Sequence, residues 1–322
     1  MTENLRRQWH TSTKILANDL HSQLKLGSTS SQLLDCATSD AVTSLSNKWF
    51  EKVEQLYNEP HRAYHNMSHV QDLLASLDLV LETHIEPSVE PKDTAIATIA
   101  AFFHDVIYNP KSSTNERDSA NLFIDFVSEL VNVIKTVSRH EQNARIDGDM
   151  SENETVTQLS SPKDSQTSES DMVFRIEQCI IATATHISCA NQARQSNNKL
   201  LAAFLDSDMS ILGRDRDRYN EYARSIRKEY EFVERSVYCE KRAKILFSFL
   251  PALKVVETVH AIPIDETSKS SSEKMKGVEE NQNRCIYATE KGRELWEYQA
   301  RENLRNEIDM LCKGLIPGEV DR

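Results

Sequence analysis

Two pairs of residues in this chain have the types and spacing needed to bind a metal ion. His65 and His69 are four residues apart, so on a helix both imidazoles project from the same face, about one turn apart. His104 and Asp105 are adjacent, and neighbours on a helix diverge by about 100°. They can therefore converge on one ion only near a helix end. Residues 108–110 (Tyr-Asn-Pro) predict such an end, because the residue before a proline disfavours helix.

Three further groups of polar residues stand at predicted helix ends, where side chains can point into a cleft. They are Asn115 with Glu116, Thr185 with His186, and Asp206 with Asp208. A site that mixes imidazole and carboxylate ligands suits Mn, Fe, Co, Ni or Zn, whereas a set of oxygen ligands alone would favour Mg or Ca. A divalent ion of this kind activates water near neutral pH and polarises a phosphoryl oxygen. The residues therefore predict metal-assisted hydrolysis of a phosphate ester.

The elements that must position these residues are predicted to be helices. Only seven glycines and eight prolines occur, and apolar residues mostly recur at spacings of three and four. Apolar stripes of this kind, each able to bury one helix face, lie within residues 70–81, 95–103, 120–134, 173–181, 219–233 and 295–311, and a further one lies at 49–56. The pattern predicts an all-α fold with at least six core helices.

Two segments interrupt the helical pattern. Residues from about 141 to 171, and again from about 264 to 284, are polar and nearly empty of large apolar side chains. They cannot bury enough surface to offset the entropy of ordering, which predicts disordered inserted loops. The expected organisation is an N-terminal helical extension over 1–45, a helical domain over 46–312 that the two inserts interrupt, and a tail over 313–322.

Composition narrows the classes of partner. The formal net charge of −12, without a basic stripe, argues against binding of a nucleic acid polymer. No stretch approaches the roughly 18 to 20 uncharged apolar residues that span a bilayer, and the start has no signal-peptide core. The six cysteines include no Cys-x-x-Cys pair, which favours reduced thiols. We expect a cytoplasmic protein with no membrane partner, and the sequence leaves its oligomeric state open.

The order of His69, then His104 with Asp105, then a late aspartate resembles the HD-domain superfamily of metal-dependent phosphohydrolases. Longer phrases resemble a bacterial and fungal group of predicted HD phosphohydrolases, and they lie at residues 62–69, 103–108, 115–120, 185–186, 206–213 and 219–230. The resemblance covers roughly residues 49–250 and the last helix. It implies an HD-domain helical bundle with a divalent metal ion, and it names no substrate.

The phrase His-Asn-x-x-His at 65–69, followed by Phe-His-Asp at 103–105, is also similar to the catalytic domain of cyclic nucleotide phosphodiesterases. That resemblance implies that His65 is the general acid that protonates the leaving oxygen. It implies a metal site made of His69, His104, Asp105 and Asp208. Asp208 is preferred to Asp206 because Asp-Met-Ser resembles the Ala-Asp-Leu-Ser phrase of that family. No glutamine and phenylalanine purine clamp can be placed near the C-terminus, which disfavours cyclic nucleotides as substrates.

Four other residues have alternative roles. Glu116 either activates water, binds a second ion through water, or caps a helix. His186 resembles a histidine near the second-metal side of the phosphodiesterase site, and it either contacts a second ion or a phosphate, or is structural. Arg62 either contacts a substrate phosphate or pairs with a carboxylate of the helical frame. Asp206 competes with Asp208 for the role of late ligand.

Three functions are compatible with these residues. The first is hydrolysis of a small phosphomonoester or phosphodiester, with a nucleotide-like small molecule as the expected partner. The second is an HD-type di-iron oxygenase, for which Glu116 and His186 would supply extra ligands. The third is a metal- or nucleotide-binding module without catalysis. It is the weakest, because all the polar groups that the chemistry needs are intact.

Overall fold

The computed structural model describes residues 2–24, 36–84, 90–146, 171–250 and 285–319, and every regular element in these ranges is a helix. The predicted all-α fold is therefore confirmed. The α-helices are α1 (Thr2–Gln23), α2 (Cys36–Tyr57), α3 (Met67–His84), α4 (Pro91–Phe103), α5 (Asn115–Ile146), α6 (Asp171–Ala182), α7 (His186–Gln195), α8 (Lys199–Asp208), α9 (Arg216–Glu229), α10 (Arg235–Phe249), α11 (Glu290–Gly292) and α12 (Tyr298–Cys312). Shorter helical segments are η1 (Thr183–Thr185), η2 (Met209–Gly213) and the π-helical η3 (Arg293–Glu297).

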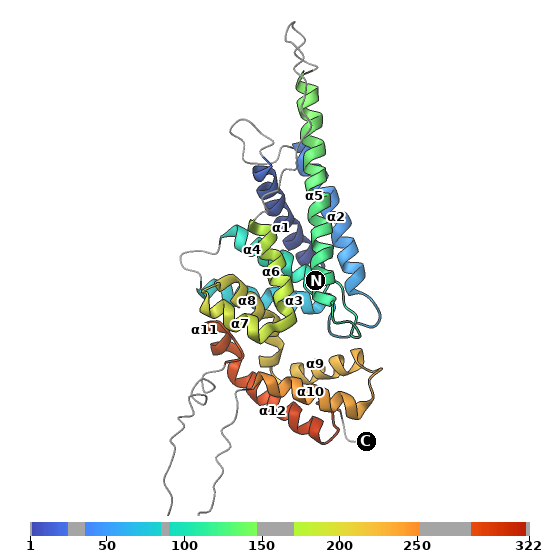
Figure 1. Cartoon of the computed structure of the whole chain (residues 1–322), viewed down its shortest axis with the longest axis vertical. Coiled ribbons are helices and arrows are strands. Elements are labelled where there is room, and N and C mark those ends of the chain that lie inside the picture. The colour runs from blue at the N-terminus through green and yellow to red at the C-terminus, as the bar shows by residue number, and fades with distance from the viewer. Residues whose placement is uncertain (1, 25–35, 85–89, 147–170, 251–284, 320–322) are drawn as a thin grey trace, which may run out of the picture.

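The first group of helices packs around aromatic side chains. Helices α1, α2, α4, α5 and α6 contact one another and make up the upper part of the molecule in Figure 1. The large side chains that are fully or almost fully buried between them are Trp9, Trp49, Phe50, Phe102, Phe103 and Phe126. The indole N–H of Trp9 donates to the carbonyl of Ser46 at 2.9 Å, which ties α1 to α2.

Helix α1 packs against α2, α4 and α5. Helix α2 continues unbroken from Cys36 to Tyr57 across residue 45, where the N-terminal helical extension was predicted to end. Apolar side chains of α1 bury one face of the helix at Leu5, Trp9 and Leu16.

Helix α4 lies at the centre and carries part of the candidate site. All nine residues from Ala95 to Phe103 are buried, as expected for a helix that is apolar all round. The His104 N–H still donates to the Ala100 carbonyl at 2.8 Å, after which the chain leaves the helix. The helix end that was predicted before Pro110 is therefore present, and it falls at the His104–Asp105 pair.

The second group consists of α9, α10 and α12, which lie below the other helices in Figure 1. A buried amide joins this group to the rest, because Asn303 of α12 donates to the carbonyls of Leu212 and Arg214 at 2.9 and 2.8 Å. The predicted tail folds onto the same group as far as residue 319. Arg224 donates to the Gly318 carbonyl, and Arg235 donates to the Gly314 carbonyl, both at 2.8 Å.

The two predicted inserts fall mainly outside the described residues. For the first, 141–171, α5 includes residues 141–146 and α6 begins at Asp171, and residues 147–170 lie outside the described residues. The second, 264–284, lies entirely outside the described residues.

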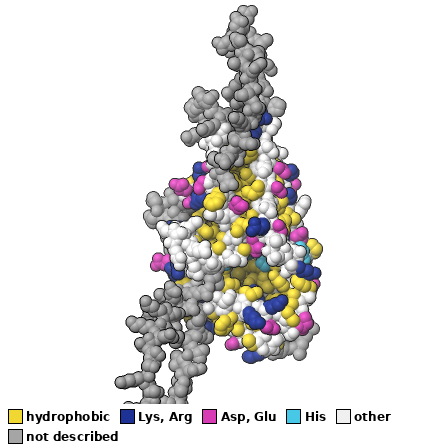
Figure 2. All heavy atoms as spheres, viewed as in Figure 1, with side chains coloured by type: hydrophobic (Ala, Val, Ile, Leu, Met, Phe, Trp, Pro, Cys, Tyr) yellow, Lys and Arg dark blue, Asp and Glu magenta, His cyan; other side chains and the backbone are white. Residues whose placement is uncertain are grey.

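None of the described helices combines the length and apolar character needed to cross a bilayer. On the face drawn in Figure 2, acidic and basic side chains are interspersed among hydrophobic ones, without a continuous basic band. Free thiols are found at Cys179, Cys189, Cys239, Cys285 and Cys312.

Candidate metal centre

The metal ligands that the sequence predicts come together where three helices begin or end. His69 lies in the first turn of α3, His104 and Asp105 follow the last residue of α4, and Asp208 is the last residue of α8. Helices α3, α4 and α8 contact one another, so their ends are held in fixed relation. His69, His104 and Asp105 form a group that could hold a metal ion, and an oxygen of Asp208 lies against it.

Three of the donor pairs are separated by a distance expected within one coordination shell, and two others are slightly farther apart. His69 Nε2 lies 3.0 Å from both His104 Nε2 and Asp208 Oδ1, and His104 Nε2 lies 3.0 Å from Asp105 Oδ2. The longer pairs are His69 Nε2 to Asp105 Oδ2 at 3.6 Å and His104 Nε2 to Asp208 Oδ1 at 3.5 Å. Ligands at about 2.1 Å from one ion lie roughly 3.0 to 3.4 Å apart, for octahedral and tetrahedral angles respectively. The residues present therefore fit a divalent ion.

The charges at this cluster also favour a cation. Burial lowers the pKa of His104, but the carboxylates of Asp105 and Asp208 outweigh it and raise that pKa well above 6.5. His104 Nδ1 lies 2.8 Å from the Ala101 carbonyl, which can only accept, so Nδ1 carries the proton and Nε2 is left as the ligand atom. Two carboxylates in a buried site require positive charge beside them, and a divalent ion supplies it together with coordination.

His186 lies at the side of this cluster. It is the first residue of α7, and its Nε2 lies 2.5 Å from Asp208 Oδ2, whereas Asp208 Oδ1 faces His69 and His104. The two oxygens of one carboxylate thus face different histidines, as in a carboxylate that can bridge two ions. Glu116, in the first turn of α5, lines the same cavity and makes no hydrogen bond to another described residue. Both residues stay candidates for a second ion.

Asp206 is not at the cluster. Its carboxylate accepts hydrogen bonds from the backbone N–H groups of Ala288 and Thr289, both at 2.7 Å, and from the Thr289 hydroxyl at 2.6 Å. Burial raises the pKa of Asp206 to about 6, against the lowering effect of these hydrogen bonds. Asp206 therefore fastens the segment that precedes α11 to α8, and the geometry leaves Asp208 as the late ligand.

Substitution of the two aspartates is expected to separate these roles. Asp208→Asn should lower the bound metal content, since an amide is a poor replacement for a charged ligand. Asp206→Asn should lower the melting temperature of the metal-free protein, because its amide cannot accept all three hydrogen bonds, and should leave the metal content intact. Metal analysis and thermal unfolding of both proteins check this, and the reverse pattern would assign the ligand to Asp206.

His65 is held beside the cluster by a residue that the sequence did not single out as functional. Glu229, the last residue of α9, accepts a hydrogen bond from His65 Nδ1 through Oε2 at 2.6 Å. Its other oxygen accepts the backbone N–H groups of Ala63, Tyr64 and His65 at 2.7 to 2.9 Å. One buried carboxylate therefore fixes both the loop and the imidazole, and leaves His65 Nε2 as the nitrogen that can donate a proton.

His65 and Glu229 shift each other's pKa toward the charged form. Burial lowers the pKa of His65, but the hydrogen bond to Glu229 and the nearby carboxylates outweigh it, so that the pKa is raised above 6.5. Burial raises the pKa of Glu229, yet the bonds to His65 and to the loop N–H groups lower it to about 2. A protonated His65 beside an ionised Glu229 is the arrangement that a general acid needs near neutral pH.

Glu229→Gln is expected to move the alkaline limb of the activity profile to lower pH. Without the carboxylate, burial dominates and the pKa of His65 falls, so the acid is lost at a lower pH than in the wild type. Profiles of kcat/KM against pH check the shift. Glu231→Gln, an exposed neighbour, is the matched control and should leave the limb in place. A limb that does not move in Glu229→Gln would contradict the assignment of His65 as the titrating acid.

Arg62 is placed in the framework rather than in the cavity. Its Nη1 donates to the carbonyls of Asp105 and His65 at 2.6 and 3.2 Å, its Nη2 donates to the Val106 carbonyl at 2.8 Å, and its Nε donates to Glu59 at 3.0 Å. The guanidinium side chain is fully buried. These bonds join the loop of His65 to the end of α4, and they leave the guanidinium turned away from any phosphate in the cavity. Of the two alternatives for Arg62, the structure shows the pairing with a carboxylate of the helical frame, which is that of Glu59.

A cavity of about 330 Å³ opens over the cluster. The candidate residues that line it are His65, His69, Asp105, Glu116, His186 and Asp208, and they are joined by tyrosines and by Arg242. The volume is in the range of cavities that hold small molecules. The geometry thus allows a small ligand to reach the metal ligands and His65 at once.

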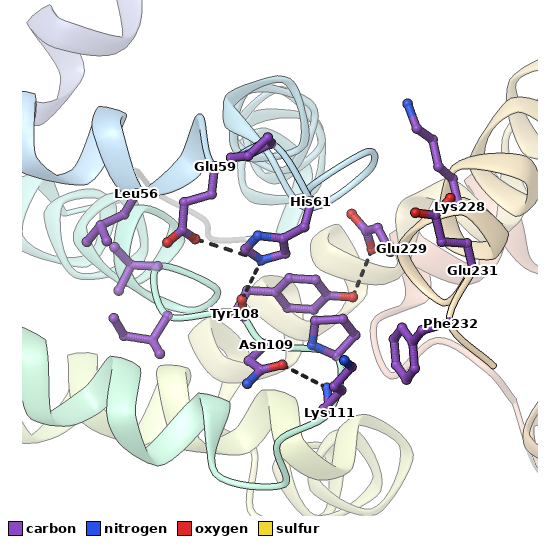
Figure 3. Close-up of a pocket in the computed structure, with 14 residues that line it drawn as sticks. Leu56, Glu59, His61, Tyr108, Asn109, Lys111, Lys228, Glu229, Glu231 and Phe232 are labelled. Atoms are coloured by element: carbon purple, nitrogen blue, oxygen red, sulfur yellow. Dashed lines mark hydrogen bonds and ion pairs between the residues drawn. The ribbon is translucent and has the colours of Figure 1, made fainter.

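A second and larger cavity, of about 700 Å³, has its lining residues drawn in Figure 3. Tyr108 lines both cavities, and Figure 3 shows its hydroxyl pointing at Glu229, to which it donates at 2.8 Å. The Tyr108 ring stacks on His65 with 4.2 Å between ring centroids. Tyr108 therefore supports the same imidazole that Glu229 holds.

Comparisons with known proteins add no relative. The chain matches no protein-family model, no curated protein and no solved structure. The helical fold and the group of His69, His104 and Asp105 are compatible with an HD-type domain.

Proposed function

We propose that this chain is an HD-type, metal-dependent phosphohydrolase that acts on a small phosphate ester. The observation that carries the proposal is the convergence of His69, His104, Asp105 and Asp208, in which the Nε2 atom of each histidine lies 3.0 to 3.6 Å from a donor atom of each of the other three residues. The presence of His65 in the same cavity adds a proton donor to the metal site. Imidazole and carboxylate donors together favour Mn, Fe, Co, Ni or Zn.

The chain's own residues divide the work in this proposal. A bound divalent ion would supply an activated water and a Lewis acid for the phosphoryl group. His65 donates the proton from Nε2 to the leaving oxygen, because its Nδ1 is bonded to Glu229. Glu229 and Tyr108 hold the imidazole in this orientation. The buried helix ends keep the ligands in place before any substrate binds.

A panel of nucleotide and sugar phosphates, assayed with each of several divalent ions, tests the proposal. The metal-free protein should release no phosphate, and release should return when Mn²⁺ or Co²⁺ is added. The Asp208→Asn protein serves as the control for contaminating phosphatases. If this chain is the enzyme, the variant must lose phosphate release to the same extent as it loses bound metal. Failure of every ester with every ion would overturn the proposal.

A di-iron oxygenase is a second candidate function because of one observation. The Asp208 carboxylate faces His69 through Oδ1 and His186 through Oδ2, which is the placement needed to join two metal sites. Two bound irons per chain, with consumption of dioxygen and no release of phosphate, would favour this function over hydrolysis.

A further inference from the structure

Arg242, on α10, lines the same cavity as the metal ligands. Its side chain is 12% exposed, and its Nε donates to Glu307 Oε1 at 3.0 Å. Its Nη2 donates to the Tyr222 hydroxyl at 3.1 Å. The guanidinium is therefore held rigidly at the cavity wall by partners from α9 and α12.

The partner carboxylate of Arg242 belongs to the protein interior. Glu307 is 1% exposed, does not line the cavity, and also accepts a 2.5 Å hydrogen bond from the Tyr219 hydroxyl. The Nη1 nitrogen of Arg242 has no hydrogen-bond partner among the described residues. A guanidinium has five N–H donors in a planar fork, and a buried one gains from an acceptor for each. The donors that remain are available to a ligand in the cavity.

Two tyrosine rings separate Arg242 from the metal ligands. The Tyr64 ring lies 4.8 Å from the His69 ring, and the Tyr222 ring lies 4.7 Å from that of Tyr64. Arg242 Cζ lies 5.4 Å from the centre of the Tyr222 ring. No ion pair joins Arg242 to Asp105 or Asp208 in the described part of the chain. Arg242 and the metal site thus form two separate binding points on one wall.

The charges of the two binding points are complementary to one kind of ligand. Arg242 is the only lysine or arginine among the described residues that line the cavity, whereas Asp105, Asp208 and Glu116 line it as acids. A divalent ion held by the acids attracts a phosphate, and the guanidinium attracts a second oxyanion.

We infer that Arg242 is a specificity-determining residue, and that the ester bound by this site carries a second oxyanion, a carboxylate or a phosphate, which Arg242 binds. This inference rests on the proposed function, because it assumes that the phosphate of the ester binds at the metal ion. A small ligand with both groups fits a cavity of about 330 Å³.

Calorimetric binding of alkylphosphonates to the Mn²⁺-loaded full chain tests the inference without any turnover. The probes are pentylphosphonate and two matched compounds, in which a carboxylate or a second phosphonate replaces the terminal methyl group. Because hydrogen bonds to charged groups are strong, we expect at least one of the doubly charged probes to bind about ten- to a hundred-fold more tightly than pentylphosphonate. The carboxylate and phosphonate arms identify which oxyanion the site prefers.

Substitutions of Arg242 must abolish this preference. In Arg242→Gln the affinity ratio between doubly and singly charged probes should fall to near one, and Arg242→Lys should restore it only in part, because a lysine lacks the planar fork. Arg235→Gln, which removes an exposed arginine from the same helix, is the matched control and should keep the wild-type ratio. If Arg242→Gln fails to fold because Glu307 is left unpaired, the double variant Arg242→Gln with Glu307→Gln takes its place.

Each outcome decides the inference. An affinity ratio near one in the wild type, or a ratio that persists in Arg242→Gln, overturns it, as does a wild type that binds none of the probes. A preference that depends on Arg242, in a protein that hydrolyses no ester, supports the oxyanion site and contradicts the proposed hydrolase. Because binding and hydrolysis are measured separately, the two failures are distinguishable.

Discussion

His104→Ala is expected to lose its bound metal ion and its phosphate release together. The substitution removes the donor that lies 3.0 Å from both His69 Nε2 and Asp105 Oδ2, at the buried end of α4. Substitution of outer-shell partners alone typically costs 10- to 100-fold in metal affinity, so loss of a direct ligand should cost more than about 100-fold. Metal analysis after dialysis, together with a phosphate-release assay on the same sample, measures both effects.

The control for this prediction is His10→Ala. His10 bonds to the Ser46 hydroxyl at 2.7 Å among the N-terminal helices, away from the cluster, and its loss should leave metal content and activity unchanged. Circular dichroism should show that both proteins stay helical. Full metal content in His104→Ala would remove His104 from the ligand set and would undo the site as described.

His65→Asn is expected to keep its metal and lose most of its kcat. The asparagine amide can still donate to Glu229, so the loop should stay in place, but no group remains to protonate the leaving oxygen. General acid catalysis contributes about 10²- to 10⁴-fold, and kcat for an alkyl phosphate should fall by that amount with little change in KM.

The choice of leaving group separates catalysis from structure in this variant. An ester of p-nitrophenol needs little protonation as its bond breaks, so His65→Asn should lose much less activity with p-nitrophenyl phosphate than with the alkyl phosphate. Equal losses with both esters would indicate that His65 is structural rather than a proton donor.

Local pattern was enough to predict the helices and the helix end at which two of the candidate ligands lie. The three-and-four spacing of apolar residues within 95–103 predicts the buried helix α4, and Pro110 predicts that it ends near His104 and Asp105. In α1, Leu5, Trp9 and Leu16 form a similar apolar stripe. A stripe shows that a helix buries one face, but it does not show which helices cover that face.

The supporting residues of the site could not be predicted in the same way, because they act across long distances in sequence. Glu229 holds a loop 164 to 166 residues earlier in the chain, and Arg242 pairs with Glu307 across 65 residues. The phrase at 219–230 marks the neighbourhood of Glu229, yet a carboxylate near a helix end has no spacing that identifies its partner. The choice between Asp206 and Asp208 could not be predicted for the same reason. The two residues are only two positions apart on α8, but Asp206 contacts Ala288 and Asp208 contacts His69.

The most direct test of the central claim is to follow bound metal and phosphate release together while Mn²⁺ is added to metal-free protein. The account predicts that ester hydrolysis rises in proportion to bound ion and stops rising when the site of His69, His104, Asp105 and Asp208 is filled. A protein that binds the ion fully and hydrolyses no phosphate ester, and that instead consumes dioxygen when loaded with iron, would contradict it.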